Sequence, residues 1–534
     1  MSLLSRSKPL KILVSFLCGL GLILGLSSLY PAWTASLPPT PLSTQGSQIL
    51  DAQGRPILLR GVNWFGMETD TRSPHGLWVR DYQSMLKQIK DLGYNIIRFP
   101  FSVEGLRANS ISGVDFNIGS NRELQGKTPL QVMDLVVQEA ERQGLFILLD
   151  SHRLNQYRIP ELWYGDGYSE QDWIDTWTML ARRYRQQKNV IGADLKNEPH
   201  GPASWGTGDR TTDWRLAAER CGNAIQAVNP DWLIVVEGVE KNVPGQQLAN
   251  HWWGGNLEGV RRFPVRLNVP RKLVYSPHEY GMGVSDQAWF HEPSFPANLR
   301  DRWQIGFQYI ADEQIAPILI GEFGGRQVDN QSKEGIWQRA LVRFIEEKDL
   351  HFTYWSWNPN SGDTGGILQD DWQQIHQDKQ ALLSTLLGKN PTTPQPSPTP
   401  QPSPTPQPSP TPQPSPTPQP SPTPQPSSTS GGNTGGLVVQ GTMDSDWETG
   451  FCYRFAIANR SNQTSPPWRL RFRMNQAQVQ NSWNGDFRRQ GSEYTVTPAS
   501  WAQRVQPNQV VDMGFCVNKQ GADYRPSAGE ILIP

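Results

Sequence analysis

Cysteine is scarce in this chain. The 534 residues include 4 Cys, namely Cys18, Cys221, Cys452 and Cys516. So few cysteines cannot supply the disulfide framework on which small secreted domains depend. Cys452 and Cys516 each follow a Phe in strand-like surroundings, and export from the cell would leave their pairing open. Cys221 lies within a helical pattern and is expected to be a small packed residue.

The chain also has no excess of charge of either sign. It carries 49 Lys and Arg against 50 Asp and Glu. A nucleic acid partner is therefore not expected, because no basic surplus is available to neutralise phosphates. What the chain has in quantity is tryptophan: 21 Trp, many of them beside Gly, Asn or Asp and so in loops. Exposed indoles commonly stack on flat apolar faces such as those of sugar rings.

One long apolar run is present, at the N-terminus. Arg6, Lys8 and Lys11 precede the run Ile12–Tyr30, and small residues follow at 32–36. This arrangement predicts a secretory signal over residues 1–36 and hence a secreted protein. The run is longer than the usual apolar region of about 7–15 residues, so an uncleaved membrane anchor stays open as the alternative.

Residues 46–388, which follow a leader rich in Pro, Thr and Ser, alternate between apolar strands and helical patterns. Eight strands alternating with helices predict a (β/α)8 TIM barrel. A doubly wound sheet would need a phosphate-cradling Gly-rich turn after its first strand, and Val62-Asn-Trp-Phe-Gly66 is not one. The expected strands are 61–65, 95–100, 145–150, 191–197, 232–237, 273–277, 317–321 and 352–357, and helical patterns include 81–92, 129–143, 169–187 and 214–228.

Two further segments follow the barrel. Residues 389–436 form a linker rich in Pro, Thr and Ser, in which Thr-Pro-Gln-Pro-Ser-Pro repeats with a period of six before a Ser/Thr/Gly stretch. Proline at alternate positions excludes helix and sheet and favours an extended polyproline II spacer. Residues 437–534 show short alternating strands and few helical patterns, which predicts an all-β sandwich serving as an appended binding module.

Polar residues stand where the predicted barrel strands end. Parallel strands of a barrel open on one face, so these residues converge there however far apart they lie in sequence. Glu198 ends the fourth strand and Glu322 the seventh. The other residues at strand ends are Arg98, His152, Asn197, His278, Tyr280 and Trp355.

Two carboxylates without a nucleophilic Ser or Cys motif point to glycoside hydrolysis. Glu322, expected near Arg98 and Tyr280, is the predicted nucleophile, and Glu198 the predicted acid/base. Strands four and seven face each other across a barrel, so we expect the carboxyl separation of about 5–5.5 Å that accompanies retention.

The supporting residues have expected roles as well. Asn197 is expected to donate to the sugar 2-hydroxyl. Trp355 would form the floor of the pocket, and His152 and His278 would position the substrate or the carboxylates. No His-x-x-x-His or Cys-x-x-Cys spacing supports a metal site, and we expect no cofactor.

These motifs resemble glycoside hydrolase family 5, and within it the bacterial endoglucanases. The resemblance covers nearly the whole predicted barrel. It implies a retaining (β/α)8 enzyme with Glu198 as acid/base, Glu322 as nucleophile and His75 in the active-site cleft. The loops 69–72, 154–157 and 204–207, where related enzymes carry cysteines, have none. The matching stretches include Gly61-Val-Asn-Trp-Phe-Gly66, His75-Gly-Leu-Trp78, Leu149-Asp-Ser-His-Arg153, Asn197-Glu-Pro199, Trp252-Trp-Gly-Gly-Asn256, Ser276-Pro-His-Glu-Tyr280 and Gly321-Glu-Phe-Gly324.

The C-terminal segment is similar to carbohydrate-binding module family 2. The similarity rests on Asp446-Trp-Glu-Thr-Gly-Phe451 and on the surroundings of four tryptophans. It implies that Trp447, Trp483 and Trp501 form a surface platform for cellulose, whereas Trp468 is buried in the core.

The sequence therefore predicts a monomeric, exported endo-β-1,4-glucanase that binds cellulose or a related β-glucan and has no stable protein partner. One rival is the same chemistry on mannan, xyloglucan or another β-glycan. The loop residues Trp163, Trp205, Trp252, Trp289 and Trp357 are expected to distinguish these substrates. A noncatalytic polysaccharide-binding protein is the second rival.

Overall fold

The computed structural model describes residues 37–388, 436–447, 450–498, 502–507 and 509–533. They form two compact units, one on either side of residue 400. The predicted signal or anchor at 1–36 and nearly all of the predicted linker lie outside the described residues. In the part of the chain that is described, no helix combines the length and apolar character needed to cross a membrane.

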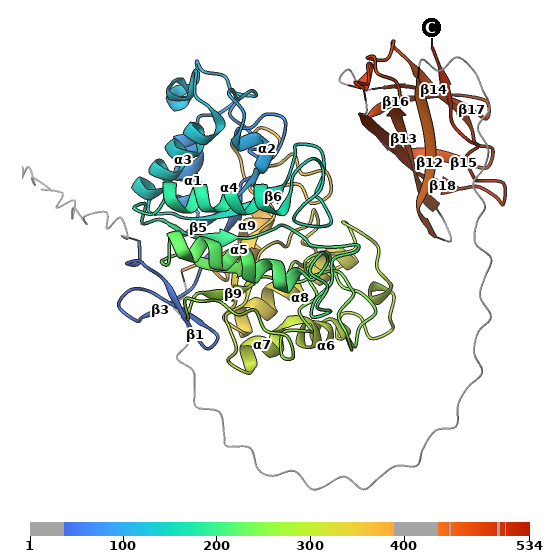
Figure 1. The fold of residues 1–534 in the computed structure, drawn as a ribbon. Helices are drawn as coiled ribbons and strands as arrows, with labels where there is room; N and C mark the ends of the chain where they lie inside the picture. The colour runs from blue at the N-terminus through green and yellow to red at the C-terminus, as the bar shows by residue number, and fades with distance from the viewer. Residues whose placement is uncertain (1–36, 389–435, 448–449, 499–501, 508, 534) are drawn as a thin grey trace, which may run out of the picture. The chain divides into compact units, whose positions relative to one another are not determined.

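Eight parallel strands form the centre of the first unit (Figure 1). The two end strands of the sheet meet, because parallel bridges join Tyr275 to Ile318 and His278 to Glu322. The sheet therefore closes into a barrel, which confirms the predicted (β/α)8 fold over a doubly wound sheet. In sheet order the strands are β10 (Leu319–Ile320), β11 (His351–Tyr354), β4 (Arg60–Asn63), β5 (Ile96–Ser102), β6 (Phe146–Arg153), β7 (Val190–Asp194), β8 (Leu233–Val236) and β9 (Leu273–Tyr275).

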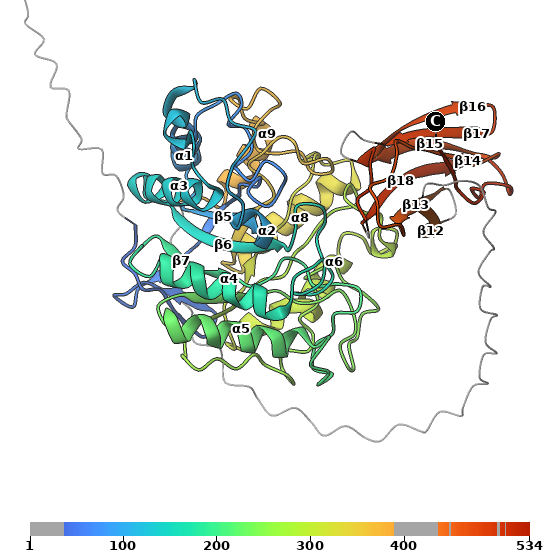
Figure 2. The same cartoon turned by 45° about the horizontal axis from the view of Figure 1, so that its top comes forward.

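Helices cover the outside of the barrel, with α1 beside α3 and α4 beside α5 (Figures 1 and 2). The ends of α3 follow from local chemistry. The Thr128 hydroxyl accepts from the Gln131 N–H, the Gln131 side chain accepts from the Thr128 N–H, and the helix ends at Gly144 with φ 72°. The α-helices are α1 (Tyr82–Asp91), α2 (Val103–Leu106), α3 (Pro129–Gln143), α4 (Glu170–Arg183), α5 (Trp214–Val228), α6 (Asn298–Trp303), α7 (Tyr309–Asp312), α8 (Lys333–Glu347) and α9 (Gln377–Ser384); short helical turns lie at Gly119–Leu124, Ala288–Phe290 and Gln304–Gln308.

A small antiparallel sheet lies at the base of the barrel. Its strands are β1 (Ser43–Gln45), β2 (Gln48–Leu50) and β3 (Pro56–Ile57). Leu42 and Ile49, each 1% exposed, pack with apolar side chains from the barrel strands. This packing buries the base, away from the ends where the polar residues gather. Packing against the barrel therefore extends to Leu42.

The second unit consists of two four-stranded sheets, which confirms the predicted all-β sandwich. Phe455, Phe472 and Phe515 meet in its core. Trp468 is 2% exposed, and its indole N–H donates to the Ala502 carbonyl at 3.0 Å, as expected for a core tryptophan. One sheet holds β12 (Leu437–Trp447), β13 (Gly450–Asn459), β18 (Val510–Lys519) and β15 (Ala477–Trp483), and the other β16 (Gly485–Gln490), β17 (Glu493–Pro498), β14 (Arg469–Arg473) and β19 (Glu530–Leu532).

The cysteines within the described residues differ in their bonding. Cys452 on β13 is disulfide-bonded, and the residue directly opposite it on β18 is Cys516. The pairing that the sequence left open therefore agrees with the register of these strands. Cys221 is buried within α5 and is free, as expected for a packed residue.

Candidate active site

The predicted site residues gather at one end of the barrel. Glu198 follows β7 and Glu322 follows β10. A carboxyl oxygen of each and a ring nitrogen of His278 lie within 4.8 Å of one another. The remaining strand-end residues come from neighbouring strands: Arg98 from β5, His152 from β6, Asn197 after β7, His278 and Tyr280 after β9, and Trp355 after β11.

Arg98 is fully buried beneath the two glutamates. Its guanidinium lies 2.6 Å from Glu322 Oε1 and donates to Asn197 Oδ1 at 3.0 Å. The Arg98 Nε also lies 2.7 Å from Asp194 Oδ2. A buried cation is stable only where such partners replace water. Arg98 therefore fixes the positions of both Glu322 and Asn197.

Three buried acids around Arg98 were missed by the sequence analysis: Asp150, Asp194 and Glu237. Asp150 and Glu237 each place an oxygen 3.1 Å from the guanidinium. Burial raises the pKa of Asp150 to about 7 and that of Glu237 to about 8, although the positive charges of Arg98 and His278 oppose the rise. The sequence did carry one signal, because Asp194 directly follows the apolar residues 190–193, and an acid buried there requires a partner.

Glu322 holds two short hydrogen bonds. In addition to Arg98, the Tyr280 hydroxyl donates to Glu322 Oε2 at 2.6 Å. Trp252 packs edge-on against the Tyr280 ring and holds it in place. Burial raises the pKa of Glu322, and the positive charges of His278 and Arg98 oppose that rise. Both donors stabilise the negative charge that a nucleophile must carry.

Glu198 has a different environment. Its backbone is in the left-handed region with φ 53°, and its N–H donates to Glu237 Oε2 at 2.7 Å. His278 Nδ1 lies 3.2 Å from Glu198 Oε1. Burial acts to raise the pKa of Glu198, but the hydrogen bond from His278 and the positive charges of His278, His152 and His200 together lower it. The two carboxyls interact strongly and so titrate as a pair.

His278 connects both catalytic candidates to the buried acids. Its Nε2 lies 3.3 Å from Glu237 Oε1, and its Nδ1 lies 3.5 Å from Glu322 Oε2. Burial opposes its charged form, yet Glu237 and Glu322 raise the pKa of His278 well above its ordinary value. The surrounding carboxyl groups therefore favour the charged form of the ring.

Aromatic rings form one wall of the site. The Trp355 ring stacks on Phe65, with centroids 5.2 Å apart, and on His152, with centroids 5.3 Å apart. His152 Nδ1 lies 2.7 Å from Asp150 Oδ2, which fixes the ring. His75 packs edge-on against Phe65, so this last predicted residue belongs to the same wall.

The loop tryptophans are largely buried. Trp163, Trp205, Trp252, Trp289 and Trp357 are each 8% exposed or less, as are Glu198 and Glu322. Their expected part in distinguishing substrates stays a prediction.

The exposed tryptophans of the first unit's described residues are Trp78 and Trp253, at 36% and 43%. Trp253 stacks face to face on His200, with centroids 3.7 Å apart. His200 Nδ1 in turn donates to the Glu198 carbonyl at 2.7 Å. This indole is therefore connected to the predicted acid/base through a single residue.

Two groups of side chains bring three potential metal ligands together. They are Asp150, His152 and Glu322, and Glu198, His278 and Glu322. Both include Glu322, whose charge already faces the Arg98 guanidinium at 2.6 Å. A cation placed there would be repelled by Arg98, so the donor set fits a metal poorly.

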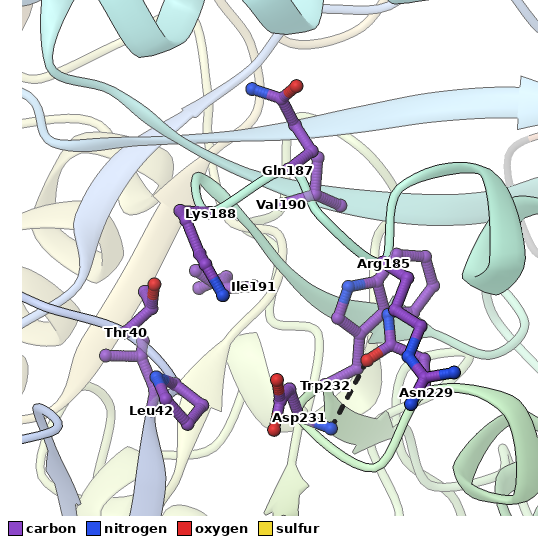
Figure 3. Close-up of a pocket in the computed structure, with 11 residues that line it drawn as sticks. Thr40, Leu42, Arg185, Gln187, Lys188, Val190, Ile191, Asn229, Asp231 and Trp232 are labelled. Carbon is purple, nitrogen blue, oxygen red and sulfur yellow. Dashed lines mark hydrogen bonds between the residues drawn. The ribbon is translucent and has the colours of Figure 1, made fainter.

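A pocket lies at the base of the barrel, away from these residues (Figure 3). Residues such as Thr40, Leu42, Lys188 and Trp232 line it, and it admits about one water, too little room for a sugar. The barrel end where Glu198 and Glu322 meet is the candidate active site.

The predicted cellulose-binding platform is only partly described. Trp447 ends β12 and Trp483 ends β15, the two outer strands of one sheet of the second unit. Their side chains, and all of Trp501, lie outside the described residues.

Comparisons with known proteins agree with this geometry. The family model described as "Cellulase (glycosyl hydrolase family 5)" matches residues 50–361, and the model described as "Cellulose binding domain" matches residues 438–531. The chain is 51% identical over 345 residues to an endoglucanase of Paenibacillus polymyxa, covering 64% of this chain and 86% of the relative. It is 43% identical over 344 residues to the major extracellular endoglucanase of Xanthomonas campestris, covering 64% and 70%.

Solved structures are similar as well. The hyperthermophilic endocellulase of Pyrococcus horikoshii is 44% identical with a TM-score of 0.61, covering 66% of this chain and all of the other. Structures of that endocellulase in complex with cellotetraose have also been determined with either of two glutamates replaced by alanine. The catalytic domain of the Xanthomonas enzyme is 41% identical with a TM-score of 0.62, covering 65% and 100%. The first family model spans more than half of this chain, and the chain therefore belongs to the cellulase family, glycosyl hydrolase family 5, and carries a cellulose-binding domain.

Proposed function

We propose that this protein is an endo-β-1,4-glucanase that cleaves cellulose with retention of configuration. The observation that carries the proposal is the approach of the Glu198 and Glu322 carboxyl oxygens to within 4.8 Å. Direct attack on the sugar requires carboxyls about 5–5.5 Å apart, whereas about 6.5–9.5 Å is needed to admit the water used in inversion.

Glu322 is the proposed nucleophile. One of its oxygens attacks the anomeric carbon of the sugar while the bond from that carbon to the glycosidic oxygen breaks. Glu198 gives its proton to the departing oxygen, which leaves as a hydroxyl. The hydrogen bonds from Arg98 and Tyr280 orient Glu322 for this attack.

Glu198 then acts as a base. It takes a proton from a water molecule whose oxygen attacks the same carbon from the face that the leaving group vacated. The ester bond to Glu322 breaks, and the carboxylate is regenerated. Two inversions at one carbon give net retention.

Asn197 is the proposed donor to the sugar 2-hydroxyl. Its Oδ1 accepts from Arg98 at 3.0 Å, and its Nδ2, which lies 3.5 Å from His152 Nε2, has a second N–H that can donate to the sugar. Trp355, which stacks with Phe65 and with His152, is the proposed aromatic surface against which the ring of the bound sugar packs.

Cellulose as substrate is supported by the names of the relatives and by the cellotetraose bound to the Pyrococcus variants. The cellulose-binding domain would hold the barrel near insoluble polymer and so raise the local substrate concentration. Secretion is proposed from the signal-like pattern at residues 1–36 and from the extracellular Xanthomonas relative.

The test is a time course of viscosity and reducing ends on carboxymethylcellulose, glucomannan and xylan, with Glu322→Gln as the comparison. We expect a fast fall in viscosity on the cellulose derivative, and a loss of activity in the variant of roughly 10⁴-fold or more. Activity confined to mannan or xylan would change the proposed substrate and leave the proposed mechanism in place. Activity retained by Glu322→Gln would refute the nucleophile, and a folded protein inactive on all three polymers would favour a binding protein.

A further inference from the structure

Glu237 is a buried residue at the end of β8 that contacts three residues of the candidate site. It is 0% exposed. Its Oε2 accepts from the Glu198 N–H at 2.7 Å. Its Oε1 lies 3.1 Å from the Arg98 guanidinium and 3.3 Å from His278 Nε2.

The contact with the Glu198 backbone holds an unfavourable conformation. Glu198 has φ 53°, a region that L residues other than Gly occupy at a cost of about 1 kcal/mol or more. Such a conformation persists where surrounding contacts determine it, and the Glu198 N–H has a short bond to a buried carboxyl. The direction in which the Glu198 side chain leaves the backbone therefore depends on Glu237. An oxygen able to accept this N–H remains in either protonation state of the carboxyl.

The contact with His278 acts on the Glu198 side chain. Glu237 Oε1 lies at an ion-pair distance of 3.3 Å from Nε2 of the ring, and the opposite nitrogen, Nδ1, lies 3.2 Å from Glu198 Oε1. A carboxyl beside one ring nitrogen favours an orientation that turns the other nitrogen away from it. Glu237 thus contacts both the backbone N–H of Glu198 and the ring that faces the Glu198 carboxyl.

The space around Glu237 is tight. A Cβ added to Gly254, which has φ 72°, would lie 2.3 Å from Glu237 Oε2 and 3.4 Å from the Glu198 Cα. The loop carrying Gly254 therefore packs closely against Glu237, and a methyl group at this position would displace the Glu237 carboxyl.

We propose that Glu237 is a positioning residue for the acid/base Glu198, which it holds through the Glu198 N–H and through His278. The inference rests on the role proposed above for Glu198. Removal of Glu237 is expected to affect Glu198 and not Glu322, because the hydrogen bonds to Glu322 come from Arg98 and Tyr280.

The test compares two soluble substrates that differ in their need for an acid. Dinitrophenyl cellobioside has a leaving group that departs without a proton, whereas phenyl cellobioside requires one. For Glu237→Ala in the full-length protein we expect kcat/KM on the phenyl substrate to fall on the order of 10²-fold, the scale of general acid catalysis. On the dinitrophenyl substrate we expect a fall of no more than about threefold in the first, glycosylation step.

Three further variants make the result decisive. Glu198→Gln should show the same dependence on leaving group; if it does not, the proposed role of Glu198 fails. Glu258→Ala is the matched control, because Glu258 also accepts from a backbone N–H, that of Leu248, and pairs with a buried histidine, His251. It should change neither rate. Gly254→Ala replaces Glu237→Ala if the latter does not fold.

An equal loss on both substrates in a folded Glu237→Ala or Gly254→Ala protein would show a general structural role and overturn the inference. Unchanged rates on both would overturn it as well. If Glu198→Gln shows the leaving-group dependence and the Glu237 variant does not, the inference on Glu237 fails and the proposed function stands.

Discussion

Replacing Tyr280 by Phe removes one hydroxyl from the candidate site and little else. The hydroxyl donates to Glu322 Oε2 at 2.6 Å, and the ring packs edge-on against Trp252. Phenylalanine keeps that ring, so the packing is retained. A hydrogen bond to a charged group contributes about 1.5–3 kcal/mol. At about 1.4 kcal/mol per tenfold, kcat/KM should fall about 10- to 150-fold.

The same change should move the pH profile. Loss of a donor disfavours the ionised form of Glu322, and its pKa rises. The acidic limb of kcat/KM against pH is therefore expected to move to higher pH. The assay is the rate of dinitrophenyl cellobioside hydrolysis across the pH range, together with the Tm of each protein.

Tyr275→Phe is the matched control. Tyr275 lies on β9, and its buried hydroxyl accepts from the Val265 N–H at 3.0 Å rather than contacting a carboxylate. It should lose stability and keep its rate and pH profile. If Tyr280→Phe stays within about twofold of the wild-type rate, or if its acidic limb moves to lower pH, the reasoning about Glu322 is wrong.

Three other predictions concern separate parts of the chain. His351 is buried and accepts from the Leu59 N–H at 3.1 Å, and burial lowers its pKa to about 3. The neutral ring stabilises the fold fully above about pH 6.5, and this stabilisation is lost as pH falls toward 3, by about 2 kcal/mol at pH 5. Between pH 7 and pH 5, the free energy of unfolding measured in urea should therefore fall less in His351→Gln than in the wild type. Equal falls in the two proteins would contradict this prediction. Trp253→Ala removes the exposed indole stacked on His200, and KM for carboxymethylcellulose should rise about 2- to 10-fold with little change in Tm; an unchanged KM would exclude a sugar platform there. Cys452→Ser should destabilise the second unit by about 2–5 kcal/mol in calorimetry and leave the barrel transition in place, whereas an unshifted second transition would argue against the disulfide.

The sequence predicted the barrel because its strands are short, apolar and regularly separated by helices. All eight expected strands are present, and the helices Pro129–Gln143 and Trp214–Val228 have the expected bounds. Convergence of strand ends is a property of the topology itself. Glu198 and Glu322 therefore met as expected although they are far apart in the chain.

Partners that depend on burial were not predicted. Asp150, Asp194 and Glu237 surround Arg98 because a guanidinium with 0% exposure needs acceptors, and that need appears only once the barrel has closed. The exposure of tryptophans was also not predictable. Trp252 and Trp253 are adjacent in sequence, yet one is 8% exposed and supports Tyr280, and the other is 43% exposed.

The most direct test of the proposed mechanism is to trap the covalent intermediate. A dinitrophenyl cellobioside with fluorine in place of the 2-hydroxyl slows both steps, and its good leaving group allows the glycosyl-enzyme to accumulate. Mass spectrometry of the protease-digested protein should find the fluorocellobiosyl group on the peptide that contains Glu322. A label on Glu198, or hydrolysis of the fluorinated substrate with an inverted product and no adduct, would contradict the account.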